Sequence, residues 1–230
     1  MIKDNINNIR AKIAESCKKC GRDPKEVTLI GVTKYADAAM VKEAVDAGMT
    51  DMGENKVQDA KERFVQLDEW GVKVKRHMIG HLQSNKVKPT LQLFDVVQSV
   101  DSLDLAKEVS NQAAKLNKDS VAIFVQVKTS DEESKFGITP ENAISLIGQI
   151  SDLPHLKIEG LMTMAPYTED KELIRNCFRQ LRQVKDAAQK EFKNKVNIDL
   201  KHLSMGMSDD FDIAIEEGST MVRVGRAIFK

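Results

Sequence analysis

The segment VTLIGVTKYADAAMVKEAVDAG, residues 27–48, predicts a buried strand followed by a helix. Its first part, residues 27–35, is apolar and rich in branched residues, as in a strand that is covered on both faces. Its second part, residues 38–48, has apolar residues at helical spacing and ends at Gly48, a typical residue after a helix. The segment is one β–α unit, and the fold depends on how often this unit recurs.

The same alternation continues along the chain and supplies seven more strand candidates. A helix candidate follows each of the first seven strands, and an additional helix, residues 2–19, precedes the first strand. An open sheet of this length has roughly five to seven strands, so eight favour a closed (β/α)8 TIM barrel in one domain, residues 1–230. The seven further strands are expected near residues 51–54, 77–80, 95–100, 121–128, 157–164, 199–206 and 221–229.

The composition narrows the class of protein. The 35 basic and 35 acidic residues balance, so charge gives no reason to expect nucleic acid or an anionic membrane as the main partner. No apolar run approaches the ~20 residues of a membrane span, and the N-terminus lacks the pattern of a signal peptide. Three cysteines argue against a disulfide framework and for a reducing compartment. We therefore predict a cytoplasmic protein.

Lys34 is a candidate because barrel active sites lie at the carboxyl ends of the strands. It ends the first predicted strand, after the apolar run LIGV. Partial burial there would lower the pKa of its amine and make it a better nucleophile toward a carbonyl. The alternative is an ordinary solvated lysine where a strand meets water.

Two turns near the C-terminus suggest a phosphate site. The first, LSMGMSDD at 203–210, leads into a helix with Ser208 as its expected N-cap, and backbone N–H groups at such a place bind phosphate. The second contains Gly225, which allows close backbone approach, and TIM barrels often bind phosphate between these two loops. Asp209 and Asp210 argue against phosphate unless they point away, and an ordinary capped turn is the alternative.

Arg223 interrupts the apolar eighth strand and needs a partner if it lies inside the barrel. A structural ion pair with Glu54 or Glu159 is one hypothesis. A phosphate near the last two strands and a carbonyl near Lys34 describe pyridoxal 5'-phosphate (PLP), although a sugar phosphate held by a lysine aldolase would also fit.

Six segments carry a resemblance that runs in order through nearly the whole chain. They resemble the pyridoxal phosphate homeostasis protein family, whose members are close relatives of the barrel domain of alanine racemase. The resemblance implies the fold-type III PLP-binding barrel. The segments are GVTKY (31–35), GENKVQ (53–58), HMIGHLQSNK (77–86), EGLMTMAP (159–166), HLSMGMSDDF (202–211) and TMVRVGRAIF (220–229).

The resemblance also implies a role for each site residue. Lys34 would carry PLP as a Schiff base, Asn55 would lie near the ring edge, and Arg223 would face the pyridine nitrogen. The phosphate would be held by Ser204, Ser208 and the backbone of Gly225 and Arg226, with Met207 nearby. The chain departs from its relatives at Arg226, where many have a small or hydroxyl residue, and at Gln126 and Lys128, where they often have asparagine.

These roles favour a carrier over an enzyme. A permanently charged Arg223 would leave the ring nitrogen unprotonated and the ring a weaker electron sink. Racemization needs a second acid/base, which alanine racemase takes from a further domain that we do not expect here. Tyr35 should point away from Lys34 along the strand, and Tyr167 is a weak candidate.

We accordingly expect no catalytic residues and a role in intracellular PLP homeostasis, as a monomeric carrier or buffer that hands PLP to apo-PLP enzymes. An amino-acid racemase-like PLP enzyme is the alternative, and a Schiff-base aldolase is a third hypothesis. We expect no metal site, because Cys17 and Cys20 form a lone CxxC pair and because His77 and His81 lack a metal-binding motif.

Overall fold

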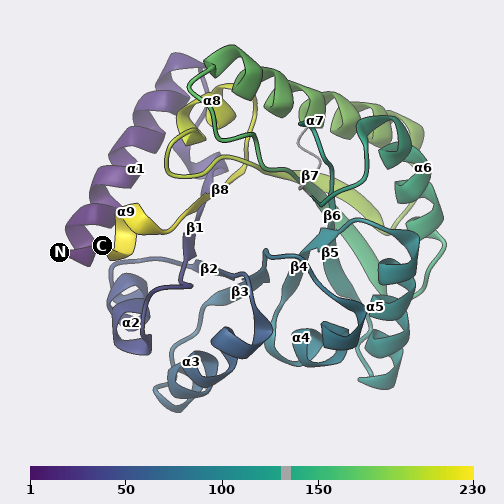
Figure 1. The fold of residues 1–230 in the computed structure, drawn as a ribbon, viewed down its shortest axis with the longest axis horizontal. Coiled ribbons are helices and arrows are strands. Elements are labelled where there is room, and N and C mark those ends of the chain that lie inside the picture. Colours follow the sequence, from purple (N-terminus) through teal and green to yellow (C-terminus); the bar gives the residue numbers. More distant parts are fainter. Residues whose placement is uncertain (131–135) are drawn as a thin grey trace.

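The computed structural model describes residues 1–130 and 136–230. Within these ranges eight parallel strands close into a barrel, in which each strand pairs with the next and β8 pairs with β1. Figure 1 looks into this ring of strands. The predicted eight-stranded barrel is confirmed. The strands are β1 (Thr28–Val32), β2 (Asp51–Glu54), β3 (Lys75–Met78), β4 (Val96–Val100), β5 (Val121–Gln126), β6 (Leu156–Met162), β7 (Ile198–Ser204) and β8 (Met221–Val224).

The helices surround the ring of strands (Figure 1). None in the described part of the chain is long and apolar enough to cross a membrane. Short 3-10 helices occupy Pro24–Glu26 and Ser84–Lys86. The α-helices are α1 (Ile2–Lys19), α2 (Ala38–Asp46), α3 (Val57–Glu69), α4 (Val87–Leu93), α5 (Leu103–Lys115), α6 (Pro140–Ser151), α7 (Lys171–Glu191), α8 (Phe211–Glu216) and α9 (Arg226–Phe229).

The predicted N-terminal helix is present as α1. Its apolar residues Ile2, Ile6, Ile9 and Ile13 recur at helical spacing, and all four are buried. The helix packs against α2, α8 and α9, so it joins the first helix of the barrel to the last. The amide of Asn5 donates a hydrogen bond to the carbonyl of Ile228 at 2.9 Å and strengthens this contact.

Side-chain caps fix where several helices begin. The carboxylate of Asp37 accepts a hydrogen bond from the N–H of Met40 at 2.8 Å at the start of α2. The carboxylate of Asp170 accepts hydrogen bonds at the start of α7, the longest helix described. These caps satisfy N–H groups that have no partner inside the helix, and they end the loops that precede the helices.

Three predicted boundaries near the site are wrong. The first strand ends at Val32 and not at residue 35, because the N–H of Ala36 bonds the carbonyl of Thr33 at 2.9 Å and closes a turn. The eighth strand ends at Val224, and residues 226–229 form the short helix α9. Helix α8 begins at Phe211, so its N-cap residue is Asp210 and not Ser208.

Helix α1 should contribute measurably to stability. Replacing the fully buried Ile6 by alanine leaves a cavity beneath the helix, and we expect the free energy of unfolding in urea to fall by about 2–5 kcal/mol. The matched control is Val196→Ala, since Val196 is 97% exposed and the same kind of truncation there removes no core contact. Equal unfolding curves for the two variants would show that α1 is not part of the cooperative core.

Candidate functional site

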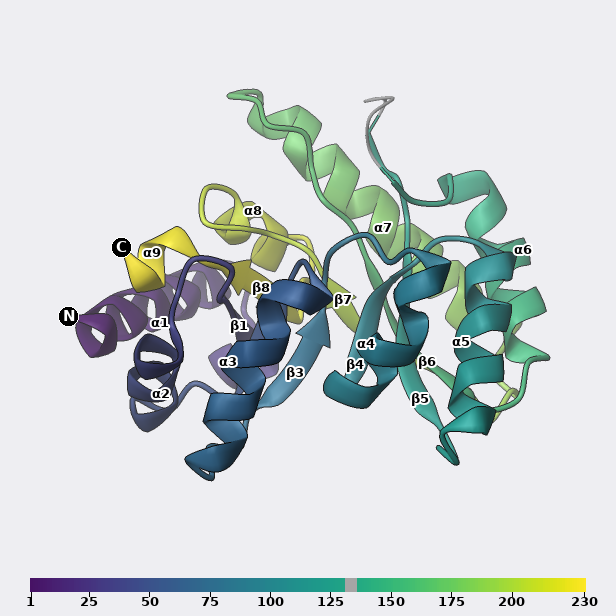
Figure 2. The ribbon, with the colours of Figure 1, turned by 60° about the horizontal axis from the view of Figure 1, so that its bottom comes forward.

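The predicted site residues gather at one end of the barrel. Lys34, Asn55, Ser208 and Arg226 lie in the segments that follow β1, β2, β7 and β8. These four strands are consecutive around the ring, because β8 closes onto β1. Parallel strands end on the same side, so the four segments form one arc of the barrel mouth. Figure 1 shows the order of these strands around the ring, and Figure 2 shows the barrel turned by 60°.

Lys34 lies in the turn after β1 and is exposed, which differs from the partly buried position predicted for it. Strand β1 ends two residues earlier, at Val32, so the Lys34 side chain does not pack against the barrel. Tyr35 is 70% exposed and does not point away, because the Lys34 Nζ lies 4.8 Å from the centre of its ring. Alternation along a strand does not apply to a turn, which is why that prediction was wrong.

The turn that carries Lys34 is fixed on both sides. The Thr33 hydroxyl donates to Oε1 of Glu54 at 2.5 Å, and the Thr33 N–H donates to the carbonyl of Gly53 at 3.1 Å. On the other side, the Nε of Arg63 donates to the carbonyl of Ala36 at 2.8 Å. The Lys34 backbone is therefore held in place while its amine stays accessible.

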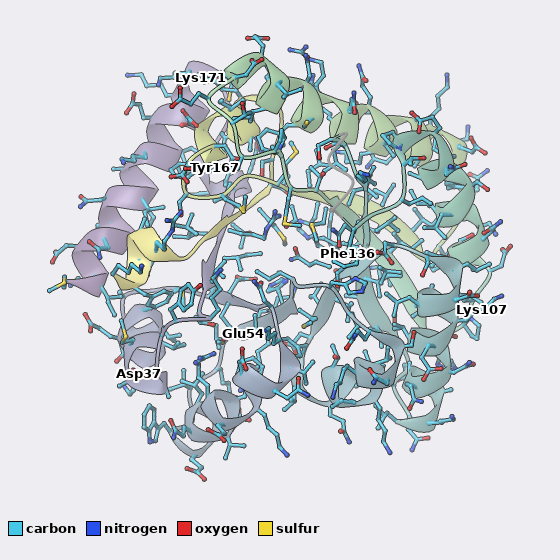
Figure 3. The ribbon with its side chains drawn as sticks, in the orientation of Figure 1. Asp37, Glu54, Lys107, Phe136, Tyr167 and Lys171 are labelled. Atoms are coloured by element: carbon cyan, nitrogen blue, oxygen red, sulfur yellow. The ribbon has the colours of Figure 1, made fainter. Side chains whose placement is uncertain are left out.

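A buried ion pair connects these two anchors. The Arg63 guanidinium contacts the Glu54 carboxylate, and the side chains are 11% and 1% exposed. Figure 3 labels Glu54 between the ring of strands and α3, the helix that carries Arg63. Burial raises the pKa of Glu54 above its usual value, although Thr33 and Arg63 counteract this effect. Arg63, on α3, is thus a structural cation.

Backbone and side-chain contacts fix the loop after β7, the first of the two loops predicted to hold phosphate. The N–H of Arg223 donates to the carbonyl of Gly206 at 3.0 Å. Gly206 has φ +95°, and a Cβ there would lie 2.6 Å from the Cβ of Ala214, so this position requires glycine. Asp210 is buried, and its carboxylate accepts from the N–H of Met207 at 2.5 Å, so it is turned into its own loop.

Arg226 bridges the same loops from outside. Its side chain is 64% exposed and pairs with Asp209 at 3.6 Å, so it extends toward solvent. Ser208 is half-buried in the loop between β7 and α8, and Met207 is exposed beside it. The two acidic residues that argued against phosphate are thus engaged elsewhere, Asp210 within the loop and Asp209 with Arg226.

Arg223 lies inside the barrel, but its predicted ion pair is wrong. Glu54 pairs with Arg63, and Glu159 pairs with Lys157 at 3.1 Å. Arg223 instead donates from Nη1 to the Ser204 hydroxyl and from Nη2 to the carbonyl of Thr163, both at 2.8 Å. Burial lowers the pKa of Arg223 to about 10, which leaves it charged at neutral pH.

The interior contains polar residues that the sequence analysis did not select. Gln98 and Thr163 are fully or almost fully buried, and Gln98 contacts His77 and Ser204. Gln98 is a polar residue within the apolar run VVQSV, and this irregularity was the available signal. Asn55 is partly buried, and Gly80 is required beside it, since a Cβ at Gly80 would lie 2.1 Å from the carbonyl oxygen of Asn55.

A cavity of about 660 Å³ opens next to these residues, on the side of β3 and β5. Its lining includes Asn55, His81 and Phe136, but none of the other residues predicted to bind the cofactor. The rings of His81 and Phe136 stack at 3.6 Å between centroids. Gln126, which also lines the cavity, donates to the carbonyl of Phe136 at 3.0 Å and so helps to fix Phe136 in the cavity wall.

The remaining candidates lie apart from this arc. Tyr167 is 95% exposed beyond β6. Cys17 is buried at the end of α1, and the Cys20 thiol contacts the carbonyl of Ser16. Among residues 1–130 and 136–230 no group of three or more histidine, cysteine and acidic residues is arranged to hold a metal ion.

Comparison with known proteins identifies the family. The family model described as alanine racemase, N-terminal domain, matches residues 2–230. The chain belongs to this family. A pyridoxal phosphate homeostasis protein of Aquifex aeolicus is 36% identical over 98% of this chain and 96% of its own length, which confirms the resemblance found in the sequence.

Solved structures of this family agree with the fold. PipY of Synechococcus elongatus PCC7942, solved with PLP bound, is 31% identical, has a TM-score of 0.86 and covers 100% of both chains. Alanine racemase of Clostridium difficile 630 is 14% identical, with a TM-score of 0.72 over 95% of this chain and 55% of that chain. This second likeness shows the shared barrel fold alone.

The Glu54–Arg63 pair should control both stability and its pH dependence. Arg63→Met leaves a carboxylate buried without its cation, so we expect the free energy of unfolding at pH 7 to fall by about 3–5 kcal/mol. Because the pKa of Glu54 is higher in the folded than in the unfolded chain, the folded chain takes up a proton first. Stability should then recover as the pH falls from 7 toward the unfolded value of about 4.3.

The matched control is Arg63→Met combined with Glu54→Gln. The double variant has no carboxyl group at position 54. Its free energy of unfolding should therefore not recover at acid pH as that of the single variant does. Urea unfolding at several pH values measures both. A single variant whose stability changes with pH in the same way as the double variant contradicts the assignment.

Proposed function

We propose that this chain binds PLP at the barrel mouth through a Schiff base on Lys34 and serves PLP homeostasis as a carrier or buffer. The observation that carries the proposal is the placement of Lys34, an accessible amine on a fixed turn, beside the strand that contains the buried cation Arg223. Further support comes from PipY, whose structure contains PLP, and from relatives named as PLP homeostasis proteins.

The residues present match the three recognition elements of PLP. Its aldehyde condenses with an amine, and Lys34 supplies a solvent-exposed amine. Its phosphate needs convergent N–H groups, which the adjoining loops around Gly206 and Gly225 are suited to supply once Asp210 is turned into its own loop. Its pyridine nitrogen needs a donor, and a guanidinium has five N–H groups, of which Arg223 uses one each toward Ser204 and Thr163.

Arg223 also bears on which chemistry the site supports. A buried guanidinium that is charged at neutral pH donates a hydrogen bond to the ring nitrogen and does not protonate it. PLP, when bound, supplies an aldehyde for amines and an electron-withdrawing ring, and an unprotonated ring withdraws electrons less strongly. This environment favours holding the cofactor over driving bond changes at a substrate carbon.

The exposure of the amine supports a role as a carrier. Lys34 and Tyr35 are exposed, so acceptors in solution have access to a cofactor held there. Apo-PLP enzymes are the acceptors in this proposal, and we place the exchange in the cytoplasm with the chain acting as a monomer. Mixing PLP-loaded protein with an apo-PLP enzyme tests transfer, and size-exclusion chromatography with light scattering tests the monomer.

The position of the Schiff base provides a direct test. Protein incubated with PLP should gain an absorption band in the visible or near-ultraviolet, and borohydride should fix PLP to Lys34, as located by peptide mass spectrometry. Lys34→Ala should lose both signals. The matched control is Lys56→Ala, which removes another exposed lysine at the same mouth and should keep both.

Other outcomes would change the assignment. Fixation of PLP on Lys56 in the wild-type chain, or unchanged fixation in Lys34→Ala, would remove Lys34 from the site. Chain that takes up no PLP but retains a keto sugar phosphate after borohydride would support a Schiff-base aldolase in place of the proposed function.

A further inference from the structure

A continuous chain of hydrogen bonds crosses the interior of the barrel from β2 to β8. The Asp51 Oδ1 and His77 Nε2 atoms are 2.8 Å apart, and His77 Nδ1 and Gln98 Nε2 are 2.9 Å apart. The Gln98 Oε1 and Ser204 Oγ atoms are 2.6 Å apart, and Ser204 Oγ lies 2.8 Å from Arg223 Nη1. All five residues are buried, with His77, Gln98 and Ser204 completely so.

The two ends of this chain fix its direction. Arg223 has only donors, and an ionised Asp51 has only acceptors. Burial raises the pKa of Asp51, but hydrogen bonds from His77 and Thr50 outweigh burial and bring it below its usual value, so Asp51 is ionised at neutral pH. Each of the three residues between the ends, Ser204, Gln98 and His77, therefore accepts a hydrogen bond from its neighbour on the Arg223 side and donates one to its neighbour on the Asp51 side.

The same direction sets the state of each residue between the ends. His77 donates from Nε2, so its Nδ1 lone pair accepts from the Gln98 amide. Gln98 then presents Oε1 to the Ser204 hydroxyl, which donates to it. Gln98 Nε2 also lies 4.0 Å from the Met221 sulfur. Reversing the amide would place Oε1 against the lone pair of His77 Nδ1, which is an acceptor facing an acceptor. Ser204 is left with a lone pair for Arg223.

We infer that Asp51, His77 and Gln98 are positioning residues that act through Ser204 to hold the Arg223 guanidinium in place for the ring nitrogen of PLP. The inference rests on the proposed function and goes further, because it assigns a role to three residues that lie below the binding loops. The Thr163 carbonyl holds the other Nη atom of Arg223, so the guanidinium is fixed at two points. Its remaining N–H groups are those available to a ligand.

The test compares PLP with 1-deaza-PLP, in which CH replaces the ring nitrogen while the aldehyde and phosphate are kept. Gln98→Met keeps the side-chain volume and removes both hydrogen bonds. If Gln98 acts through Arg223 on the ring nitrogen, the dissociation constant for PLP should rise by about tenfold, while that for 1-deaza-PLP should stay within about twofold. Equilibrium dialysis with the full chain, depleted of PLP, measures both constants.

Ser204→Ala, which removes a single hydroxyl group, provides a second variant in case Gln98→Met does not fold. It cuts the same chain next to Arg223 and should show the same selective loss. If Ser204→Ala weakens the binding of PLP and 1-deaza-PLP equally, Ser204 contacts the phosphate that both ligands share. That result would overturn its role in the series of hydrogen bonds that positions Arg223. Val196→Ala, far from the interior and exposed, is the control that should change neither constant.

Two further outcomes overturn the inference and are distinguishable from each other. Wild-type chain that binds 1-deaza-PLP and PLP, combined with a Gln98→Met variant that weakens both equally or neither, rejects the positioning role and leaves the proposed function intact. Wild-type chain that binds neither compound rejects the proposed function, and the positioning role is rejected with it.

Discussion

Closure of the sheet is the constraint on which the rest of this structure depends. When β8 pairs with β1, the interior of the barrel is cut off from water, and every polar group inside must find a partner there. The chain meets this condition in two ways. A small apolar cluster that includes Ile30, Phe124 and Met162 fills part of the interior, and an ordered series of polar residues from Asp51 to Arg223 fills another part.

Two arginines near the candidate site differ in the charge of their partners. Arg63 and Arg223 have different kinds of hydrogen-bond partner: Arg63 contacts a carboxylate, whereas Arg223 donates to a hydroxyl and a carbonyl, which are neutral. The Glu54 carboxylate neutralises Arg63 by direct contact, whereas Arg223 donates to neutral acceptors and interacts with the Asp210 carboxylate through electrostatic attraction. Arg63 therefore stabilises the turn of Lys34, and Arg223 remains suited to binding.

The sequence predicted the barrel because its signals are local and repeated. The strands are short, most of them are rich in apolar residues, and a helix follows each of the first seven. Errors at single boundaries therefore did not change the topology. It also predicted that the candidate site residues follow strands of the barrel and meet at the carboxyl ends of these strands. The exposure of Lys34, the direction of Tyr35 and the partners of Arg223 could not be predicted, since each depends on where a turn begins or on side chains from distant strands. Gln98 and Ser204, 106 residues apart, meet only across the closed interior.

The pairing of β1 with β8 also has a consequence for how the chain reaches its fold. Thr28 lies opposite Met221, so one edge of β1 lacks its strand partner until almost the whole barrel has been synthesised. Contacts at such sequence separation form late and slow the search for the native state. During that interval the open edge of β1 is a template for pairing with another chain, which makes the incomplete barrel the species most exposed to aggregation.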